Sequence, residues 1–218
     1  MNGITTFALK MIAVITMLID HVGAVFFPQY LIFRVVGRIS YPIFAYTLVE
    51  GYFHTRDVKK YLIRLGVGAI LSEIPFDLAF FGRFVEWRHQ NVFFTLFLGI
   101  FMLYAINNLK NNFAKILCVA VVFCTSVLLK TDYSSMGLLM ICCFYRFRDQ
   151  KLLRNLVIGV INVFLMGGLQ MFATIALLPI ALHNGQQGRK GKWFFYGFYP
   201  IHLLVIYFSV ILLIMKRV

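Results

Sequence analysis

The side chains best suited to chemistry lie near the amino terminus, inside two long apolar stretches. Asp20 and His21 stand in the first stretch, and Arg34 and Arg38 stand in the second. A neutral imidazole can take a proton from an attacking hydroxyl or amine, and a carboxylate stabilises the imidazolium that forms. The sequence therefore predicts His21 as a general base, with Asp20 and Arg38 as supporting charges and Arg34 as a substrate-binding residue.

Helix geometry predicts that these four residues lie at a similar depth. If each stretch is a helix and the chain turns near Pro28, His21 lies roughly 9 Å below the outer end of the first helix. Arg34 and Arg38 then share one helix face and can hold a carboxylate, a phosphate or a developing oxyanion. Adjacent residues point about 100° apart, so Asp20 need not be the partner of His21. The alternative is an Asp20–Arg38 ion pair that only joins two helices.

Polar residues in the third and fourth apolar stretches are further candidates to bind substrate. Glu73 and Asp77 flank Pro75, which removes a helical hydrogen bond and is expected to bend the helix beside a cavity. Asn91 and Thr95 share a helix face and can orient a substrate, although bonding between helices explains them equally well.

The last apolar stretch and the end of the second add three more candidates for substrate binding. Tyr199 and His202 stand beside Pro200, near the middle of the final stretch. A single buried histidine is more often a hydrogen-bonded packing residue than a catalytic one. Glu50 can either contact substrate or extend its carboxylate to the membrane interface.

Basic residues of the inner loops can bind the phosphates of a cofactor. Residues 183–192 combine flexible glycines with three cations, a pattern that also follows from membrane topology alone. The candidates for cofactor binding are Lys10, His54, Arg56, Lys59, Arg64, Arg189, Lys190 and Lys192.

Composition indicates that these residues are positioned by a membrane-embedded all-α bundle. The chain has 218 residues, of which 61% are hydrophobic and 13% are charged, whereas globular proteins have about 25% charged residues. Stretches of about 20 apolar residues match the bilayer core, and lipid requires helices that satisfy their own backbone. We expect a single domain over residues 1–218 with about nine transmembrane spans, at residues 4–27, 31–53, 61–81, 92–109, 113–130, 136–147, 153–168, 169–183 and 194–214.

The distribution of Lys and Arg predicts the orientation of this bundle. Most basic residues fall in loops that lie on one side if the amino terminus is cytoplasmic, whereas the outer loops hold only Arg83, Arg88 and Lys130. By the positive-inside rule, the sequence predicts a multi-pass membrane protein with a cytoplasmic amino terminus. Membrane topology also accounts for the net charge of +13, so we expect no nucleic-acid partner.

Several other classes of site have no support in the sequence. The four cysteines fall in apolar stretches without metal-ligand spacing, and no phosphate-binding loop, nucleophile elbow or zinc-protease motif occurs. We therefore expect no metal.

Particular segments resemble a known family. Residues 9–13 and 17–23, residues 33–45 with Glu50-Gly51-Tyr52, and Tyr199-Pro200-Ile201-His202 resemble the TraX family of conjugative pilin acetylases. The first helices are also distantly similar to those of lysosomal heparan-sulfate N-acetyltransferase. The resemblance covers most of the chain. It is most specific at Asp20-His21, Gly37-Arg38 and Tyr199-Pro200-Ile201-His202.

This resemblance implies an acetyl-CoA-dependent acyltransferase of the bacterial cytoplasmic membrane. The acetyl group would pass from cytoplasmic acetyl-CoA to an amine or hydroxyl, either a peptide amino terminus or a glycan hydroxyl, within or across the membrane. Two alternatives stay open from the residues alone. One is a transporter or flippase for a small anion held by Arg34 and Arg38, and the other is an assembly factor whose buried charges only fix helix packing.

Overall fold

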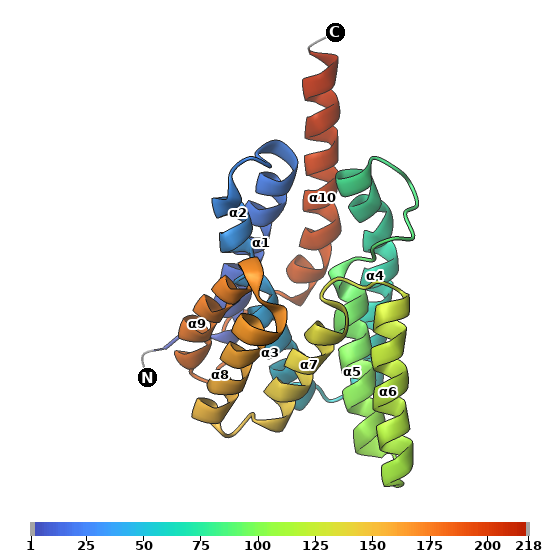
Figure 1. The fold of residues 1–218 in the computed structure, drawn as a ribbon, viewed down its shortest axis with the longest axis vertical. Helices are drawn as coiled ribbons and strands as arrows, with labels where there is room; N and C mark the ends of the chain where they lie inside the picture. The colour runs from blue at the N-terminus through green and yellow to red at the C-terminus, as the bar shows by residue number, and fades with distance from the viewer. Residues whose placement is uncertain (1–2, 217–218) are drawn as a thin grey trace.

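The protein is described by a computed structural model that covers residues 3–216 and consists of helices joined by short loops (Figure 1). In this part of the chain no β-strand forms, although two isolated bridges join Ile4 to His183 and Gln90 to Thr131. The helices are α1 (Thr6–Phe26), α2 (Leu31–Gly37), α3 (Ser40–His54), α4 (Val58–Phe81), α5 (Val92–Asn108), α6 (Asn112–Leu128), α7 (Ser134–Arg146), α8 (Lys151–Val160), η1 (Ile161–Met166), η2 (Gly168–Ala176), α9 (Leu177–Ala181) and α10 (Lys192–Met215).

Local sequence explains where several helices begin and end. Thr5, Asp57, Asn91 and Asn111 each precede a helix, and their side-chain oxygens accept hydrogen bonds from backbone N–H groups of its first turn. Helix α4 ends at Gly82, whose φ of 65° suits a residue without a Cβ. The chain thus carries its own signals for both ends of α4.

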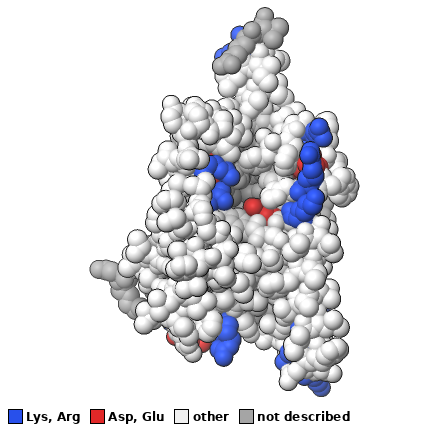
Figure 2. All heavy atoms as spheres, viewed as in Figure 1, with Lys and Arg blue, Asp and Glu red and all other residues white. Residues whose placement is uncertain are grey.

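Within residues 3–216, three segments are long and apolar enough to cross a membrane. They are Thr6–Phe26, Leu31–His54 and Lys192–Met215. The second segment contains α2 and α3, which are separated by a short break at Arg38 and Ile39. Large apolar side chains are exposed over much of the surface, and Figure 2 shows an exterior on which charged groups are sparse. These are the features of a membrane protein.

The prediction of nine complete spans is not confirmed. Helices α5 and α6 have 17 residues each and α7 has 13, which correspond to lengths of about 26 Å and 20 Å. The predicted spans 153–168 and 169–183 form a hairpin that leaves α-helical geometry on both sides of its turn. The turn is made by Gly167 and Gly168, with φ values of 61° and 52°, and η1 and η2 flank it as a π-helix and a 3₁₀-helix. Hydropathy located these segments but not their lengths or helix types.

The helices that carry the predicted site pack around one another in the middle of the molecule. Helix α1 packs against α2, α3 and α10, and α4 packs against α5 and α10. Figure 1 shows the α8–α9 hairpin on one flank, α5 and α6 on the other, and α10 extending past the rest at one end. Pro75 and Pro200 lie inside α4 and α10, and both helices continue past them.

Candidate functional site

Two histidines from opposite ends of the sequence meet in the bundle. The Nδ1 atom of His21 lies 2.8 Å from Nε2 of His202, and the two rings are nearly parallel, at 12°. The Nδ1 atom of His202 lies 2.8 Å from the carbonyl oxygen of Phe198. Because a carbonyl only accepts, His202 donates from Nδ1 and, when neutral, has a free electron pair at Nε2. His21 therefore donates from Nδ1, and this arrangement leaves its Nε2 unprotonated, as a general base requires.

Asp20 is engaged by the two arginines rather than by His21. Its carboxylate oxygens lie 2.7 Å from Nη1 of Arg34 and 3.3 Å from Nη2 of Arg38. A Cβ atom at Gly37 would collide with the Asp20 side chain, so glycine at this position lets α2 approach α1. The predicted Asp20–Arg38 ion pair between two helices is present, and Asp20 also forms an ion pair with Arg34.

These groups line a cavity of about 290 Å³ on the predicted outer side, which we call the outer cavity. Figure 2 shows a hollow with basic side chains on two sides and acidic atoms between them. The polar and aromatic residues that line the outer cavity are Asp20, His21, Arg34, Arg38, Ser40, Tyr41, Phe44, Phe76, Phe80, Phe81, His89, Asp132, Tyr133 and Tyr199. Charges of both signs thus surround the predicted base.

The loop before α7 forms part of this cavity with an unusual backbone. Lys130, Tyr133 and Ser134 have φ values of 51°, 59° and 42°, a region that residues with a Cβ rarely adopt. Thr95 donates to the backbone oxygen of Asp132, and the Tyr133 ring stacks on Tyr41 at 3.8 Å. Strained backbone of this kind persists only where its surroundings hold it, and it clusters at functional sites.

His89 and Asp132 form a second polar pair at this cavity. Nε2 of His89 lies 3.6 Å from Oδ1 of Asp132, and this carboxylate raises the pKa of His89 above its ordinary value. Neither residue was singled out from the sequence. The scarcity of charged residues in the outer loops is the feature of the sequence that could have drawn attention to them.

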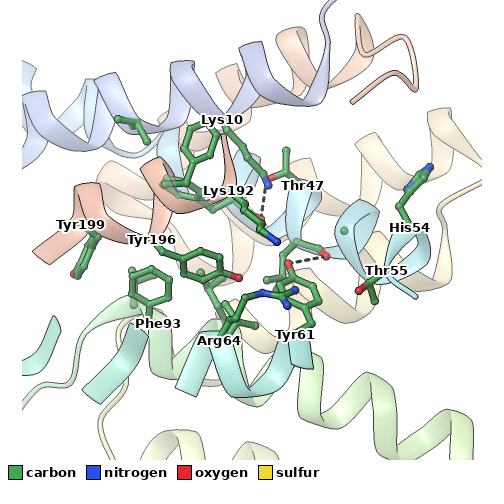
Figure 3. Close-up of a pocket in the computed structure, with 18 of the residues that line it drawn as sticks. Lys10, Thr47, His54, Thr55, Tyr61, Arg64, Phe93, Lys192, Tyr196 and Tyr199 are labelled. Atoms are coloured by element: carbon green, nitrogen blue, oxygen red, sulfur yellow. Dashed lines mark hydrogen bonds between the residues drawn. The ribbon is translucent and has the colours of Figure 1, made fainter. Parts of the chain in front are cut away.

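A second cavity, of about 280 Å³, lies on the predicted inner side, and we call it the inner cavity. Figure 3 shows Lys10 from α1, Arg64 from α4 and Lys192 from α10 directed toward the same space. His54 also lines it, and among the described residues no carboxylate does. The buried Nε of Arg64 has no hydrogen-bond partner within residues 3–216. This combination suits an anionic ligand such as a phosphate.

Half of the predicted cofactor residues do not reach the inner cavity. Arg56, Lys59, Arg189 and Lys190 are exposed and outside its lining. The loop before α10 instead binds the start of α1, where Thr6 N–H donates to the oxygen of Gln186 at 2.8 Å.

Several predicted substrate residues are committed to the scaffold. Asn91 is fully buried and donates from Nδ2 to the oxygen of Ala69 at 2.9 Å. Asp77 accepts from the backbone of Glu86 at 2.8 Å. None of these residues lines either cavity.

Glu50, which the sequence predicts either to contact substrate or to extend to the membrane interface, lies outside both cavities. Its side chain is buried and accepts a hydrogen bond from Nε of Arg148 at 2.9 Å. Arg148, which lies 98 residues further along the chain, thus supplies the hydrogen bonds that water would otherwise supply to this carboxylate.

Four side chains line both cavities and therefore separate them. They are Met17, Phe44, Val92 and Tyr199, which we call the partition. Of the four, only Tyr199 was a predicted site residue. The inner and outer cavities thus meet inside the bundle, with Lys10, Arg64 and Lys192 on one side and His21 on the other.

The fold and the site define a class of protein. It is a helical membrane protein in which a cation-lined cavity meets a second cavity that contains an imidazole. The model of the TraX protein family matches residues 6–210, so the chain belongs to the TraX family. No cluster of metal-binding side chains occurs within residues 3–216.

The chain is also similar to two curated proteins. The chain is 28% identical over 240 residues to the probable fimbrial assembly protein FimC, serogroup H1, of Dichelobacter nodosus, covering 93% of this chain and 94% of that protein. It is 31% identical over 106 residues to an uncharacterized protein of Rickettsia prowazekii, covering 48% of this chain and 39% of that one. No solved structure matches.

Proposed function

We propose that this protein is an integral membrane acetyltransferase of the bacterial cytoplasmic membrane. Acetyl-CoA binds from the cytoplasm in the inner cavity, and the acetyl group passes to an amine or hydroxyl acceptor in the outer cavity. His21 is the general base. The observation that carries the proposal is the junction of the two cavities at the partition, with phosphate-binding chemistry on one side and a base on the other.

The inner cavity fits the donor by charge. A CoA ester carries several phosphate charges, and Lys10, Arg64 and Lys192 supply cations without a competing carboxylate among the described lining residues. The unpartnered Nε of Arg64 would gain an acceptor from a bound phosphate, which removes an unfavourable buried donor. The apolar part of the lining, which includes Val14, Leu65 and Leu96, would hold the arm that ends in the thioester.

The outer cavity fits the acceptor and the proton transfer. The acceptor nitrogen or oxygen attacks the thioester carbonyl carbon while its proton passes to Nε2 of His21. The carbon–sulfur bond then breaks, and the proton passes from His21 to the departing sulfur, which leaves as the CoA thiol. Nε2 of His202 accepts the hydrogen bond from Nδ1 of His21 before and after this transfer, so His21 takes up and releases the proton at Nε2. Arg34 and Arg38 bind an anionic part of the acceptor or the developing oxyanion.

Two acceptor classes fit the proposed chemistry, and the name of one relative favours the first. FimC of Dichelobacter nodosus is named as a probable fimbrial assembly protein, which favours a pilin-like peptide amino terminus. A glycan hydroxyl is the second acceptor class that His21 could activate. With a cytoplasmic amino terminus, α1 runs from the donor side to the acceptor side.

The test is ligand binding followed by transfer. Acetyl-CoA added to the detergent-purified protein should raise its apparent stability, by about 2.7 kcal/mol at 100 times the dissociation constant. Radiolabelled acetyl groups should then appear on a synthetic peptide with a free amino terminus or on an oligosaccharide. A folded protein that is not stabilised by saturating acetyl-CoA would contradict the proposal. Equal stabilisation by small anions such as phosphate would then favour a transporter.

A further inference from the structure

One face of α1 connects the two cavities. Lys10, Val14, Met17 and His21 are spaced by four, three and four residues, so they lie on the same side of the helix. Lys10 and Val14 line only the inner cavity, His21 lines only the outer cavity, and Met17 lines both. Lys10 and His21 are about 16 Å apart along the helix axis. Met17 is therefore the residue of α1 at which a ligand in the inner cavity comes nearest to the base.

The partition consists of side chains from four different helices, and each of them lines both cavities. Met17 comes from α1, Phe44 from α3, Val92 from α5 and Tyr199 from α10. Tyr199 is 4% exposed, and its ring packs edge-on against Phe93, with the centroids 5.3 Å apart. The centroid of the Tyr199 ring also lies 6.1 Å from that of His21. A group pressed against the partition from the inner side is thus one side chain away from the imidazole pair.

We propose that the partition sets the length of the acyl group that the protein accepts. The inference rests on the proposed acyltransferase function. The phosphates are held by cations at the inner end, so the acyl end of the donor must point toward the partition. Its carbonyl must reach a nucleophile activated by His21, and the tail beyond the carbonyl then lies among Met17, Phe44 and Val92. A two-carbon acyl group leaves a methyl group there, whereas a longer chain collides with side chains that are already packed.

The experiment compares acyl-CoA esters of increasing length on partition variants. Purified wild type and Met17→Ala are titrated with acetyl-, butyryl- and hexanoyl-CoA, with CoA itself as the reference, and apparent affinity is measured from thermal stabilisation. Wild type should prefer acetyl-CoA. Met17→Ala should raise the affinity for butyryl-CoA relative to acetyl-CoA by roughly tenfold, the scale at which apolar pockets discriminate chain lengths.

Met102→Ala is the matched control. Met102 is fully buried among α5, α6 and α7 and lines neither cavity. The Met102→Ala variant should lower the stability of the unliganded protein, as loss of a core methionine does. It should leave the ratio of the affinities for butyryl-CoA and acetyl-CoA unchanged. Phe44→Leu provides a second partition variant, with the same expected direction, if Met17→Ala does not fold.

The outcomes separate this inference from the proposed function. A wild type that binds acetyl-CoA, combined with partition variants that keep its chain-length preference, would overturn the inference and leave the acyltransferase proposal standing. An equal change of preference in Met102→Ala would also overturn it, because the effect would then come from general loosening. A wild type that binds no acyl-CoA would overturn both.

Discussion

The two cavities have nearly equal volumes, about 280 and 290 Å³, but opposite kinds of charge patterning. The inner cavity gathers Lys10, Arg64 and Lys192 without a carboxylate among the described lining residues. In the outer cavity Asp20 is bound by two arginines, and Asp132 lies beside His89. An excess of one sign suits a ligand that brings its own opposite charges, whereas paired charges suit positioning and proton transfer.

This contrast indicates a division of labour between binding and chemistry. Uncompensated cations inside a membrane protein are unfavourable until a ligand neutralises them. Paired charges need no ligand, so the geometry around His21 is organised in advance. The inner cavity should therefore control donor affinity and the outer cavity the rate of transfer. Variants of the residues in each cavity test that assignment.

The largest effect is expected for His21→Asn. Loss of the general base should slow acetyl transfer by roughly 10²- to 10⁴-fold, while thermal stabilisation by acetyl-CoA should persist because His21 does not line the inner cavity. Turnover and thermal shift measured on the same preparation check both parts. Full turnover in a folded variant would remove His21 from the mechanism.

The inner cations should control affinity alone. Arg64→Ala and Lys192→Ala should each weaken acetyl-CoA binding on the order of 10- to 100-fold, since a charge-assisted hydrogen bond is worth about 1.5–3 kcal/mol. Lys59→Ala and Arg189→Ala are matched controls, because both residues are exposed and outside the cavity. Equal weakening by the controls would show that the general positive charge of the inner face, rather than the cavity, attracts the ligand.

His202 should act on the rate through the position and tautomer of His21. His202→Phe removes the acceptor for Nδ1 of His21 and should lower kcat by about tenfold, with a shifted pH profile. His202→Gln keeps an acceptor oxygen and should restore part of the rate. If the two variants have the same pH profile as the wild type, His202 has only a packing role.

The smallest effect is expected at His89. Because Asp132 raises the pKa of His89 in the folded protein, the pair stabilises the fold fully below the ordinary histidine pKa of about 6.5. That contribution is lost as the pH rises through the higher folded value. Both side chains are partly exposed, at 43% and 34%, so the change should stay below about 1 kcal/mol.

Thermal unfolding of the wild type and His89→Gln between pH 5 and 9 measures this contribution. The variant should have a flatter pH dependence of stability over this range. An unchanged profile would indicate that the pair does not form, and the outer cavity would then lose one of its paired charges.

The sequence predicted the helical class and the concentration of charges in the first helices, but not the helix lengths. Apolar composition locates segments that avoid water, and so the first and last spans were found near their observed limits. Residues 153–183 have the same composition, yet Gly167 and Gly168 turn the chain back inside one apolar region. A hydropathy average is taken over a window that is longer than such a turn, so the average does not reveal the turn.

Contacts within one helix or between neighbouring helices were accessible from spacing, whereas distant ones were not. The Asp20–Arg38 pair was foreseen because only a short turn separates α1 from α2. The His21–His202 pair joins residues 181 positions apart, and the Glu50–Arg148 pair joins residues 98 apart. Such pairs depend on how helices pack. The same limit explains why Phe44 and Val92 were not recognised as part of the site.

The hydrogen bond from His202 to the carbonyl oxygen of Phe198 has an electrical consequence. A carbonyl oxygen has no proton to pass on, so the chain of two imidazoles stops there. In the proposed mechanism the proton taken by His21 leaves with the departing sulfur, and one turnover moves no net charge through the membrane. A membrane potential acts on moved charge, at about 2.3 kcal/mol per elementary charge and 100 mV, so the resting voltage of the cell would neither drive nor oppose this reaction.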